Sequence, residues 1–576
     1  MLLETLNHHQ VIPNYFHNEA SSTAASLLQP FSIKLFSILS LCLENPYKPQ
    51  YNGGIIVNPD LQNGSQGWAQ FANAKVDFRE FGGNKFVVAR GRNQSYDSVS
   101  QKISLEKGLL YTFSAWLQVS KGKAPVIAVF KKNGEYKHAG SVIAESKCWS
   151  MLKGGLTIDE SGPAELYFES EDTTVEIWVD SISLQPFTQE EWNAHHEQTI
   201  HRTRKRGMRI RAVNSLGEPI PNATISIVQN RLGFSFGCEV EKYILVNQAY
   251  QNWFTKRFTV TTFANEMKWY STEAVRGKED YTTADAMLRF FKQHGIAVRG
   301  HNIVWNDPKY QLSWVSSLSG NDLYNAVSVV SRYKGQLLSW DVVNENLHFS
   351  FFESKMGPQA SYNIFALAHS IDPRTTMFMN EFDTLEQPGD SASSPARYLG
   401  KLRELQSIRV AGNIQLGIGL ESHFNIPNIP YMRSALDTLA ATGLPIWLTE
   451  VDVQAPPNVQ AKYFEQVLRE GHAHPQVKGM VTWSGYSPSG CYKMCLTDGN
   501  FRNLPTGDVV DKLLREWGGL RGQTTGLTDA DGFFEASLLH GDYDISIAHP
   551  LTNSTASHRF KLTSDDSQPS RFVVHV

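Results

Sequence analysis

The chain has 576 residues, of which 41% are hydrophobic and 19% are charged. This length exceeds one ordinary hydrophobic core and predicts a soluble protein of about two to four domains. The formal net charge of −4 gives no reason to expect nucleic acid or a membrane surface as a stable partner. No motif calls for a catalytic metal or an organic cofactor, and the sequence leaves the oligomeric state open.

Residues 1–54 form an N-terminal segment with one apolar run, from Phe31 to Leu43. The length of this run fits the core of a signal peptide and is short for a helix that spans a bilayer. Polar residues precede the run, which is unusual for a cleaved signal, so a signal anchor and a buried segment remain alternatives. We expect the protein to be secreted.

Residues 55–187 contain short stretches of alternating polarity, separated by turns rich in Gly, Asn and Lys. No long helical pattern interrupts them, and this arrangement predicts an all-β sandwich. The predicted strands include residues 85–89, 110–117, 125–130, 164–169 and 175–179.

Residues 188–231 read as a linker followed by a strand pair. Positions 191–199 have helical character and lead into the basic run 201–206, which we expect to be a solvated linker without function. Two strands are predicted within residues 208–228, on either side of the turn 217–221, which contains Gly and Pro.

Apolar strands alternate with helical patterns from residue 232 to residue 520. The strands recur near positions 235, 260, 298, 340, 378, 416, 446 and 480. Eight such units predict a (β/α)8 TIM barrel. Residues 521–576 return to a strand pattern and predict a small C-terminal β module. The strand pair at 208–228 either completes the sheet of this module, or the tail folds independently.

Two strands of the predicted barrel run into a carboxylate. Stretch 340–345 ends at Glu345 beside Asn344, and stretch 448–452 contains Glu450. Polar residues at the carboxyl ends of barrel strands are candidates for catalysis. A carboxyl group that leaves an apolar strand is expected to have a raised pKa. Two carboxylates at one barrel mouth predict glycoside hydrolysis, with one as the acid and the other as nucleophile or base.

These two stretches resemble the acid and nucleophile motifs of glycoside hydrolase family 10, the endo-β-1,4-xylanases. Further stretches agree with the family in the same order: 265–269, 299–305, 417–423 and 481–483. The resemblance implies an endo-acting, retaining hydrolase that cleaves β-1,4-xylosidic bonds in xylan, in degradation or remodelling of cell-wall polysaccharide. A xylan endotransglycosylase that uses the same two glutamates, and a weakly active wall protein that binds xylan, remain alternatives. The expected location is then extracellular or in the cell wall.

The resemblance also implies a role for each matched residue. Glu345 is expected to be the general acid/base and Glu450 the nucleophile. Asn344 is expected to bond the 2-hydroxyl of the sugar under attack. His423 is expected between Glu450 and Asp452, where it keeps Glu450 ionised. The further substrate-binding residues implied are Asn265, Lys268, His301, Trp305, Trp483 and Glu421.

The sequence departs from the family pattern around the expected cleavage point. Ala264 stands where the family has a Glu, which removes a hydrogen bond to a xylose one ring further from the cut. Glu421 stands where the family often has Gln, and the added carboxylate is expected to raise the pKa of Glu450. Phe382 replaces a Tyr. These departures predict a working enzyme with weakened or shifted substrate binding.

The region after Trp483 departs from the family as well. Cys491 and Tyr492 occupy the place where the family has a second Trp. Cys495 lies close enough in sequence to Cys491 to form a disulfide across the loop, with two free thiols as the alternative.

Parts of the predicted sandwich resemble family 22 carbohydrate-binding modules. The resemblance lies in Asn58-Pro-Asp, in Trp68 after a glycine, and in stretches 92–96 and 176–180. It implies a sugar-binding groove, with xylan and xylo-oligosaccharides as the partners. The groove residues implied are Arg92, Tyr96, Tyr167 and Glu171. The alternative is that Tyr167 belongs to the core and that Glu171 is a solvated loop charge.

Overall fold

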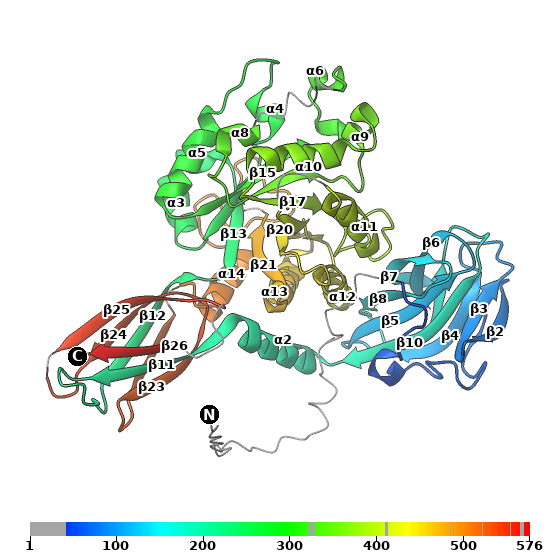
Figure 1. The fold of residues 1–576 in the computed structure, drawn as a ribbon, viewed down its shortest axis with the longest axis horizontal. Coiled ribbons are helices and arrows are strands. Elements are labelled where there is room, and N and C mark those ends of the chain that lie inside the picture. Colours follow the sequence, from blue (N-terminus) through cyan, green and yellow to red (C-terminus); the bar gives the residue numbers. More distant parts are fainter. Residues whose placement is uncertain are drawn as a thin grey trace, which may run out of the picture. The chain divides into compact units, whose positions relative to one another are not determined.

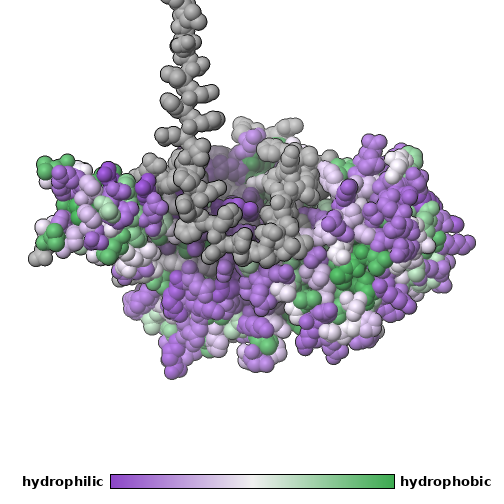
Figure 2. Space-filling model, turned by 90° about the horizontal axis from the view of Figure 1, so that it is seen from below, coloured by the Kyte–Doolittle hydropathy of each residue, from purple (hydrophilic) through white to green (hydrophobic). Residues whose placement is uncertain are grey.

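The computed structural model describes residues 42–320, 323, 329–408, 413–483, 485–520, 522–552, 554–564 and 570–576. Nearly all of the apolar run at 31–43 lies outside these residues. The described residues belong to one compact unit, residues 39–576, which contains a β-sandwich, a barrel and a second β-sandwich (Figure 1). Among them, no helix is both long and apolar enough to cross a membrane. Figure 2 shows one face of the molecule, which is largely hydrophilic with hydrophobic side chains in small groups.

The N-terminal sandwich consists of two five-stranded sheets, ordered β1-β4-β9-β6-β7 and β2-β3-β10-β5-β8, and it confirms the predicted fold. Alternate strand residues, such as Val87, Phe113 and Leu166, meet in one core between the sheets. A disulfide between Cys42 and Cys148 ties the incoming chain to the loop before β8. The elements are η1 (Gln50–Gly53), β1 (Ala69–Phe71), β2 (Lys75–Phe81), β3 (Asn84–Arg90), β4 (Ser98–Leu105), β5 (Leu110–Val119), β6 (Lys123–Lys132), β7 (Glu135–Glu145), β8 (Ser150–Leu156), β9 (Gly162–Glu169) and β10 (Ile177–Phe187).

Helix α2 (Gln189–Arg204) follows the sandwich, so the helix expected at 191–199 extends in both directions. It begins with a capping box, in which the side chains of Thr188 and Glu191 each accept a hydrogen bond from the other residue's backbone amide. The basic run at its end is not a solvated linker, which corrects the expectation from the sequence. The guanidinium of Arg204 donates to three backbone carbonyls of the barrel, those of His472, His474 and Val477. Buried carbonyls need hydrogen-bond donors, and Arg204 supplies them to the barrel. These bonds anchor the end of helix α2 to the barrel.

The second sandwich combines strands from before and after the barrel. Its sheets have the orders β23-β11-β26 and β22-β12-β24-β25. The strand pair and residues 521–576 therefore form one module, in which each strand of the pair joins a different sheet. Ile210, Ile225 and Ile545 lie in its core. The strands are β11 (Lys205–Val213), β12 (Thr224–Leu232), β22 (Gln523–Leu527), β23 (Phe533–Leu539), β24 (Gly541–Ala548), β25 (Thr555–Leu562) and β26 (Ser570–His575).

The barrel is a ring of parallel strands that the pairing of β18 with β20 closes, and it confirms the predicted (β/α)8 fold. All of β16 is buried, because helices cover the outside of the ring (Figure 1) and side chains fill the interior of such a barrel. The strands are β13 (Ser235–Val240), β14 (Val260–Phe263), β15 (Ala297–Trp305), β16 (Ser339–Asn344), β17 (Thr376–Glu381), β18 (Leu416–Leu420), β20 (Ile446–Val453) and β21 (Val477–Thr482), with the short β19 (His423–Phe424) beside β20.

Helices connect the barrel strands and begin at recognisable caps. Asn247, Ser394 and Asn428 each accept a backbone hydrogen bond at the start of a helix. The helical elements are η2 (Lys242–Leu245), α3 (Gln248–Thr255), α4 (Trp269–Thr272), α5 (Thr282–Gln293), η3 (Pro308–Tyr310), α6 (Ser313–Ser316), α8 (Val329–Tyr333), α9 (Phe351–Met356), α10 (Ala360–Ile371), α11 (Pro395–Gln406), α12 (Ile429–Ala440), α13 (Pro457–Ala473) and α14 (Pro505–Glu516).

A buried ionic cluster joins α2 to α12 and α13. Glu470 of α13 has no exposed surface. Its carboxylate accepts hydrogen bonds from Trp192 Nε1 (2.8 Å), from His196 Nε2 (2.8 Å) and from the guanidinium of Arg433. Burial alone would raise the pKa of Glu470, but Arg433 and His196 outweigh burial and hold this pKa well below its usual range. The carboxylate is therefore ionised and depends on all three partners.

We expect Glu470→Gln to lower the free energy of unfolding by about 3–5 kcal/mol, because it leaves the buried Arg433 guanidinium without its counter-charge. Thermal unfolding at neutral pH measures this loss. The advantage of the wild-type protein should shrink as the pH falls below about 4. A carboxylate with a lowered folded pKa contributes its full stability above its unfolded pKa and loses that contribution as the pH falls toward the folded pKa.

Glu465→Gln on the same helix is the matched control. The partners of Glu465, Arg469 and Lys512, are partly exposed, so this change should cost only about 0–1 kcal/mol. If both variants lose the same free energy of unfolding, the buried cluster does not stabilise the fold more than the exposed ion pairs do, and the prediction is wrong.

Candidate active site

A cleft of about 630 Å³ opens at the carboxyl ends of the barrel strands. Asp452 lies behind this cleft, and Ala264 and Tyr492 lie on its wall. Parallel strands place their carboxyl ends at one edge of the ring, which is why side chains far apart in sequence meet there. The other barrel residues singled out from the sequence all line the cleft: Asn265, Lys268, His301, Trp305, Asn344, Glu345, Glu421, His423, Glu450 and Trp483.

Glu345 directly follows β16, and only 8% of its surface is exposed. Its backbone has a φ of 57°, a left-handed conformation that costs energy in a residue with a Cβ. The Glu345 amide donates to the Asn380 carbonyl (2.9 Å) and the Phe349 amide donates to the Glu345 carbonyl (3.0 Å), which holds this turn. Burial raises the pKa of Glu345 to about 8, and the carboxylates of Glu381 and Glu450 add to the rise. Glu345 is therefore a protonated acid at neutral pH.

Glu450 of β20 is held in the opposite protonation state. Burial acts to raise its pKa, but hydrogen bonding from His423 and the charges of His301 and Lys268 bring the pKa to about 2. Nε2 of His423 lies 3.4 Å from one carboxylate oxygen, and Nε2 of His301 lies 3.9 Å from the other. The Asn380 amide also donates to Glu450 Oε1 (3.1 Å). An ionised carboxylate thus shares the cleft with a protonated one.

His423 lies between Asp452 and two glutamates of the cleft. Asp452 has no exposed surface, and its Oδ1 lies 2.8 Å from Nδ1 of His423. Burial alone would lower the pKa of His423, but Asp452, Glu421 and Glu450 raise it well above the usual range. The imidazole is therefore protonated and directs Nε2–H toward the carboxylates.

The additional carboxylate in the cleft, Glu421, has a raised pKa itself and does not raise the pKa of Glu450. This result corrects the expectation that the pKa of Glu450 would rise. Burial and the charge of Glu450 raise the pKa of Glu421 well above its usual range. The Asn380 amide donates to Glu421 Oε1 at 3.2 Å, and His423 Nε2 lies 3.5 Å from Oε2. The charges of Lys268 and His301 act on Glu450, so of the two neighbours Glu450 keeps the negative charge.

Aromatic rings and a buried lysine form one wall of the cleft. The ring of Trp305 stacks on Tyr310, with 3.8 Å between centroids, and Nζ of Lys268 lies 4.4 Å from the centre of the Trp305 ring. The hydroxyl of Tyr270 donates to Asn265 Oδ1 (2.6 Å), which orients this amide. Flat apolar faces beside fixed polar groups suit a sugar ring, which has both surfaces.

The position of Ala264 leaves a gap in the charged lining. Ala264 lines the cleft, whereas the neighbouring Glu266 points its carboxylate at the backbone amides of Lys242 (2.7 Å) and Asn265 (3.3 Å). Glu266 is thus engaged in its own loop. Glu266 therefore does not replace the carboxylate that the family has at position 264.

Tyr492 forms the rim of the cleft above His423. Tyr492 is 67% exposed, and its ring centroid lies 5.1 Å from that of the His423 ring. Cys491 and Cys495 form a disulfide across this loop, which decides between the two alternatives left by the sequence. Lys493 Nζ donates to the backbone carbonyl of His423 (3.4 Å). The loop therefore presents an aromatic face to the cleft.

Sequence reasoning missed a bridge between the loops that follow β16 and β17. Nδ1 of His348 lies 2.7 Å from Glu381 Oε1, and Nε2 lies 2.8 Å from Asp390 Oδ2. The His348 ring stacks on Phe382, and Glu381 also accepts from the Leu347 amide (2.7 Å). The sequence contains a pattern that could have predicted this bridge: Glu381 ends a barrel strand, and His348 follows Glu345 by three residues. The bridge fixes the loop that carries Glu345.

The first groove residue expected in the N-terminal sandwich, Arg92, has a structural role. Arg92 is only 5% exposed, and its guanidinium donates to backbone carbonyls of two loops. These acceptors are the carbonyls of Ser95, Asp97, Ser170, Asp172 and Val175. Its donors are occupied within the protein, so the assignment of Arg92 to a sugar groove is wrong.

Tyr167 is fully buried and does not line an open groove. It lies on β9, on the face opposite the core residue Leu166, and Phe71 stacks on its ring with 4.0 Å between centroids. Phe71 covers the surface that a sugar ring would need. Tyr96 is 42% exposed and Glu171 is exposed, so a role in binding stays a prediction for these two residues.

A closed β/α barrel that holds one protonated and one ionised carboxyl group in a single cleft has the pair of groups that a glycoside hydrolase uses. The sequence model of Glycosyl hydrolase family 10 matches residues 225–489, and that of a carbohydrate binding domain matches residues 53–174. The chain belongs to glycosyl hydrolase family 10.

Relatives extend the similarity over most of the chain. Endo-1,4-beta-xylanase 5 of Arabidopsis thaliana is 41% identical over 500 residues, covering 84% of this chain and 86% of that protein. Endo-1,4-beta-xylanase 5-like of the same plant is 39% identical over 543 residues, covering 91% and 94%. The crystal structure of xylanase 10B from Thermotoga petrophila RKU-1 in complex with xylobiose is 23% identical, with a TM-score of 0.44, and covers 50% of this chain and 95% of that chain.

We expect kcat/KM for glycoside cleavage to follow a bell-shaped pH profile. If Glu450 is the nucleophile and Glu345 the acid, cleavage requires Glu450 ionised and Glu345 protonated. Activity should therefore rise as the pH passes upward through the pKa of Glu450, about 2, and fall as it passes the pKa of Glu345, about 8. Initial rates on an aryl glycoside measure the profile. Glu345→Gln, tested on a substrate whose aryloxide leaves without a proton, should lack the basic limb, and a limb that persists would assign this ionisation to another group.

Proposed function

We propose that the chain is an endo-1,4-β-xylanase that hydrolyses xylan with retention of configuration at the anomeric carbon. The observation that carries the proposal is the pairing of protonated Glu345 with ionised Glu450 in one cleft. Family membership and relatives named as endo-1,4-beta-xylanases support xylan as the polymer.

The reaction uses the two glutamates in sequence. Glu450 attacks the anomeric carbon while Glu345 donates its proton to the oxygen of the leaving sugar, so the glycosidic bond breaks and a glycosyl ester forms. Glu345, now ionised, takes a proton from water. This water attacks the same carbon and breaks the ester, which returns both groups to their starting states. His423 and Asn380 stabilise the carboxylate of Glu450 when it is free.

The surrounding side chains then supply sugar binding. Asn344 donates to Glu345 Oε1 (3.2 Å) and is placed to reach the 2-hydroxyl of the sugar under attack. Trp483 offers an apolar surface to a sugar ring, Trp305 lines the wall with its ring packed against Tyr310, and Lys268 and His301 offer donors. Binding energy from such groups positions the anomeric carbon against the nucleophile.

The first test separates the roles of the two glutamates. Wild-type protein should release short oligosaccharides from xylan, seen by product sizing, and Glu450→Ala should release none. With azide and an aryl xylobioside, Glu450→Ala should form the α-glycosyl azide, because azide takes the place of the nucleophile. Glu345→Ala should form the β-glycosyl azide, because azide then attacks the ester on Glu450.

Unfolding curves that match the wild-type protein serve as the control for folding of both variants. The anomers are read by NMR, and reversed or identical anomers would contradict the assigned roles. Products longer than the substrate in the presence of a xylo-oligosaccharide acceptor would instead favour the transglycosylase reaction.

The second test concerns Ala264. We expect Ala264→Glu to raise kcat/KM on xylotriose about tenfold, because one regained hydrogen bond of about 1.4 kcal/mol positions a short substrate that few other contacts hold. Polymeric xylan should gain less, since contacts along a longer chain already hold it. Ala264→Gln tests whether the negative charge is needed. If kcat/KM of Ala264→Glu on xylotriose equals that of the wild-type protein, Ala264 does not lie at the sugar-binding position assigned to it.

We also infer that the N-terminal sandwich binds the same polymer and that the protein is secreted to the cell wall. The match to a carbohydrate binding domain supports binding. The two disulfides, Cys42–Cys148 and Cys491–Cys495, support an oxidising compartment, because cytosolic thiols stay reduced.

A further inference from the structure

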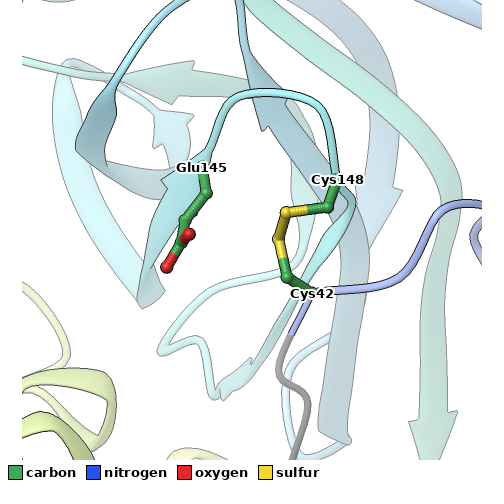
Figure 3. A group of neighbouring side chains, drawn as sticks. All are labelled: Cys42, Glu145 and Cys148. Carbon is green, nitrogen blue, oxygen red and sulfur yellow. A yellow bond between two sulfur atoms is a disulfide. The ribbon is translucent and has the colours of Figure 1, made fainter.

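Three groups of potential metal ligands converge in the described residues. The first group consists of Cys42, Cys148 and Glu145. Figure 3 shows that its two sulfur atoms are joined to each other, with Glu145 beside them. Thiolates are the form of cysteine that binds metals, and a disulfide offers none. This group is therefore a covalent link and not a metal site.

The second group lies beside the cleft and consists of His348, Asp383 and Asp390. Both ring nitrogens of His348 are engaged at normal hydrogen-bond distances, 2.7 Å to Glu381 and 2.8 Å to Asp390. A metal here has to displace one of these bonds and the bridge that holds the acid loop. The second group thus already has a structural role.

The third group, Glu421, His423 and Glu450, has a different geometry. Nε2 of His423 lies 3.5 Å from Glu421 Oε2 and 3.4 Å from Glu450 Oε2. Both distances are long for N–H···O hydrogen bonds. They match the spacing of about 3.4 Å between two ligand atoms that share a tetrahedral zinc ion at about 2.1 Å from each. The ligand atoms of all three side chains lie within 4.8 Å of one another.

The side chains behind this group are those that support a metal site. Nδ1 of His423 lies 2.8 Å from Oδ1 of the buried Asp452, the arrangement that orients a metal-binding histidine in carboxylate–histidine–zinc sites. The amide of Asn380 donates to both carboxylates, at 3.2 Å to Glu421 and 3.1 Å to Glu450. The three ligands are therefore held in place from outside the group.

We propose that Glu421, His423 and Glu450 form an inhibitory site for Zn²⁺. One imidazole and two carboxylates suit zinc better than Mg²⁺ or Ca²⁺, which prefer oxygen ligands in larger number. The ion uses the lone pair of His423 Nε2 and an oxygen of Glu421, and both groups carry a proton in the metal-free cleft. Zinc binding therefore releases two protons to solvent. The fourth coordination position faces the cleft, as three protein ligands leave one open.

Inhibition follows from the identity of one ligand and rests on the proposed function. A Glu450 carboxylate that coordinates zinc shares its negative charge with the ion and is a weaker nucleophile toward the anomeric carbon. The ion also occupies space that the sugar needs. Lys268 and His301 also face Glu450 and oppose a cation, so the site depends on the second carboxylate, Glu421. Zinc should then compete with the substrate.

The experiment compares three isosteric variants of the full chain, freed of metal with EDTA and titrated with ZnCl₂ by calorimetry. Glu421→Gln removes one ligand of the proposed site. Glu241→Gln removes another carboxylate of the same cleft, and Asp383→Asn removes a ligand of the second group. We expect Glu421→Gln to weaken zinc binding at least tenfold, and the other two variants to stay within about twofold of the wild-type protein.

The inhibition assay uses xylan with increasing zinc. In the wild-type protein zinc should raise the apparent KM and leave kcat unchanged, EDTA should reverse the effect, and equal concentrations of Mg²⁺ should have none. Glu421→Gln should need at least tenfold more zinc for the same inhibition.

Equal zinc affinity in Glu421→Gln and the wild-type protein, or a loss confined to Asp383→Asn, would overturn the proposal. Zinc binding that depends on Glu421 without effect on xylan cleavage would overturn the inhibitory role. If xylan is not cleaved at all, the calorimetry still decides the metal site, so failure of the proposed function is distinguishable.

Discussion

The constraint on which this cleft depends is that Glu345, Glu421 and Glu450 are buried together and cannot all be ionised. Each carboxyl group therefore takes the protonation state that its own neighbours favour. Glu345 has burial and like charges around it and keeps a proton. Glu450 has His423, His301 and Lys268 and loses one. The positions of His423, His301 and Lys268 therefore decide which of the glutamates is ionised and which keeps its proton.

Asn380 connects this electrostatic arrangement to the barrel. Its amide donates to Asn344 (2.9 Å), Glu421 and Glu450, and its oxygen accepts from Thr449 (2.6 Å), so side chains from three other strands or strand ends share this one group. A neutral amide links the carboxylates without adding charge. Strand registry thus sets the distances in the cleft, and a shift of one strand would change every pairing.

Buried ionic contacts also hold the parts outside the cleft. The bridge of His348 to Glu381 and Asp390 joins two loops, and the cluster around Glu470 joins α2 to the barrel helices. In each case a carboxylate satisfies several donors, so removing it leaves other buried groups without partners. In the N-terminal sandwich the buried Arg92 plays the corresponding part as a donor, since its guanidinium satisfies several backbone carbonyls at once. Residue types that suit sugar binding serve here to fix loops.

The sequence by itself determined the barrel and both glutamates, because apolar strands at regular spacing and strand-end carboxylates are local patterns. It also determined the sandwich, from strands of alternating polarity. The exposure of a side chain and the charges around it depend on residues that are distant in the sequence. Only the tertiary structure decided that Phe71 covers Tyr167, that Arg92 is saturated by carbonyls, and that Glu421 and not Glu450 has the raised pKa. The physical reason is that burial and electrostatic energy depend on neighbours brought in by distant strands, and no spacing along the chain contains those distances.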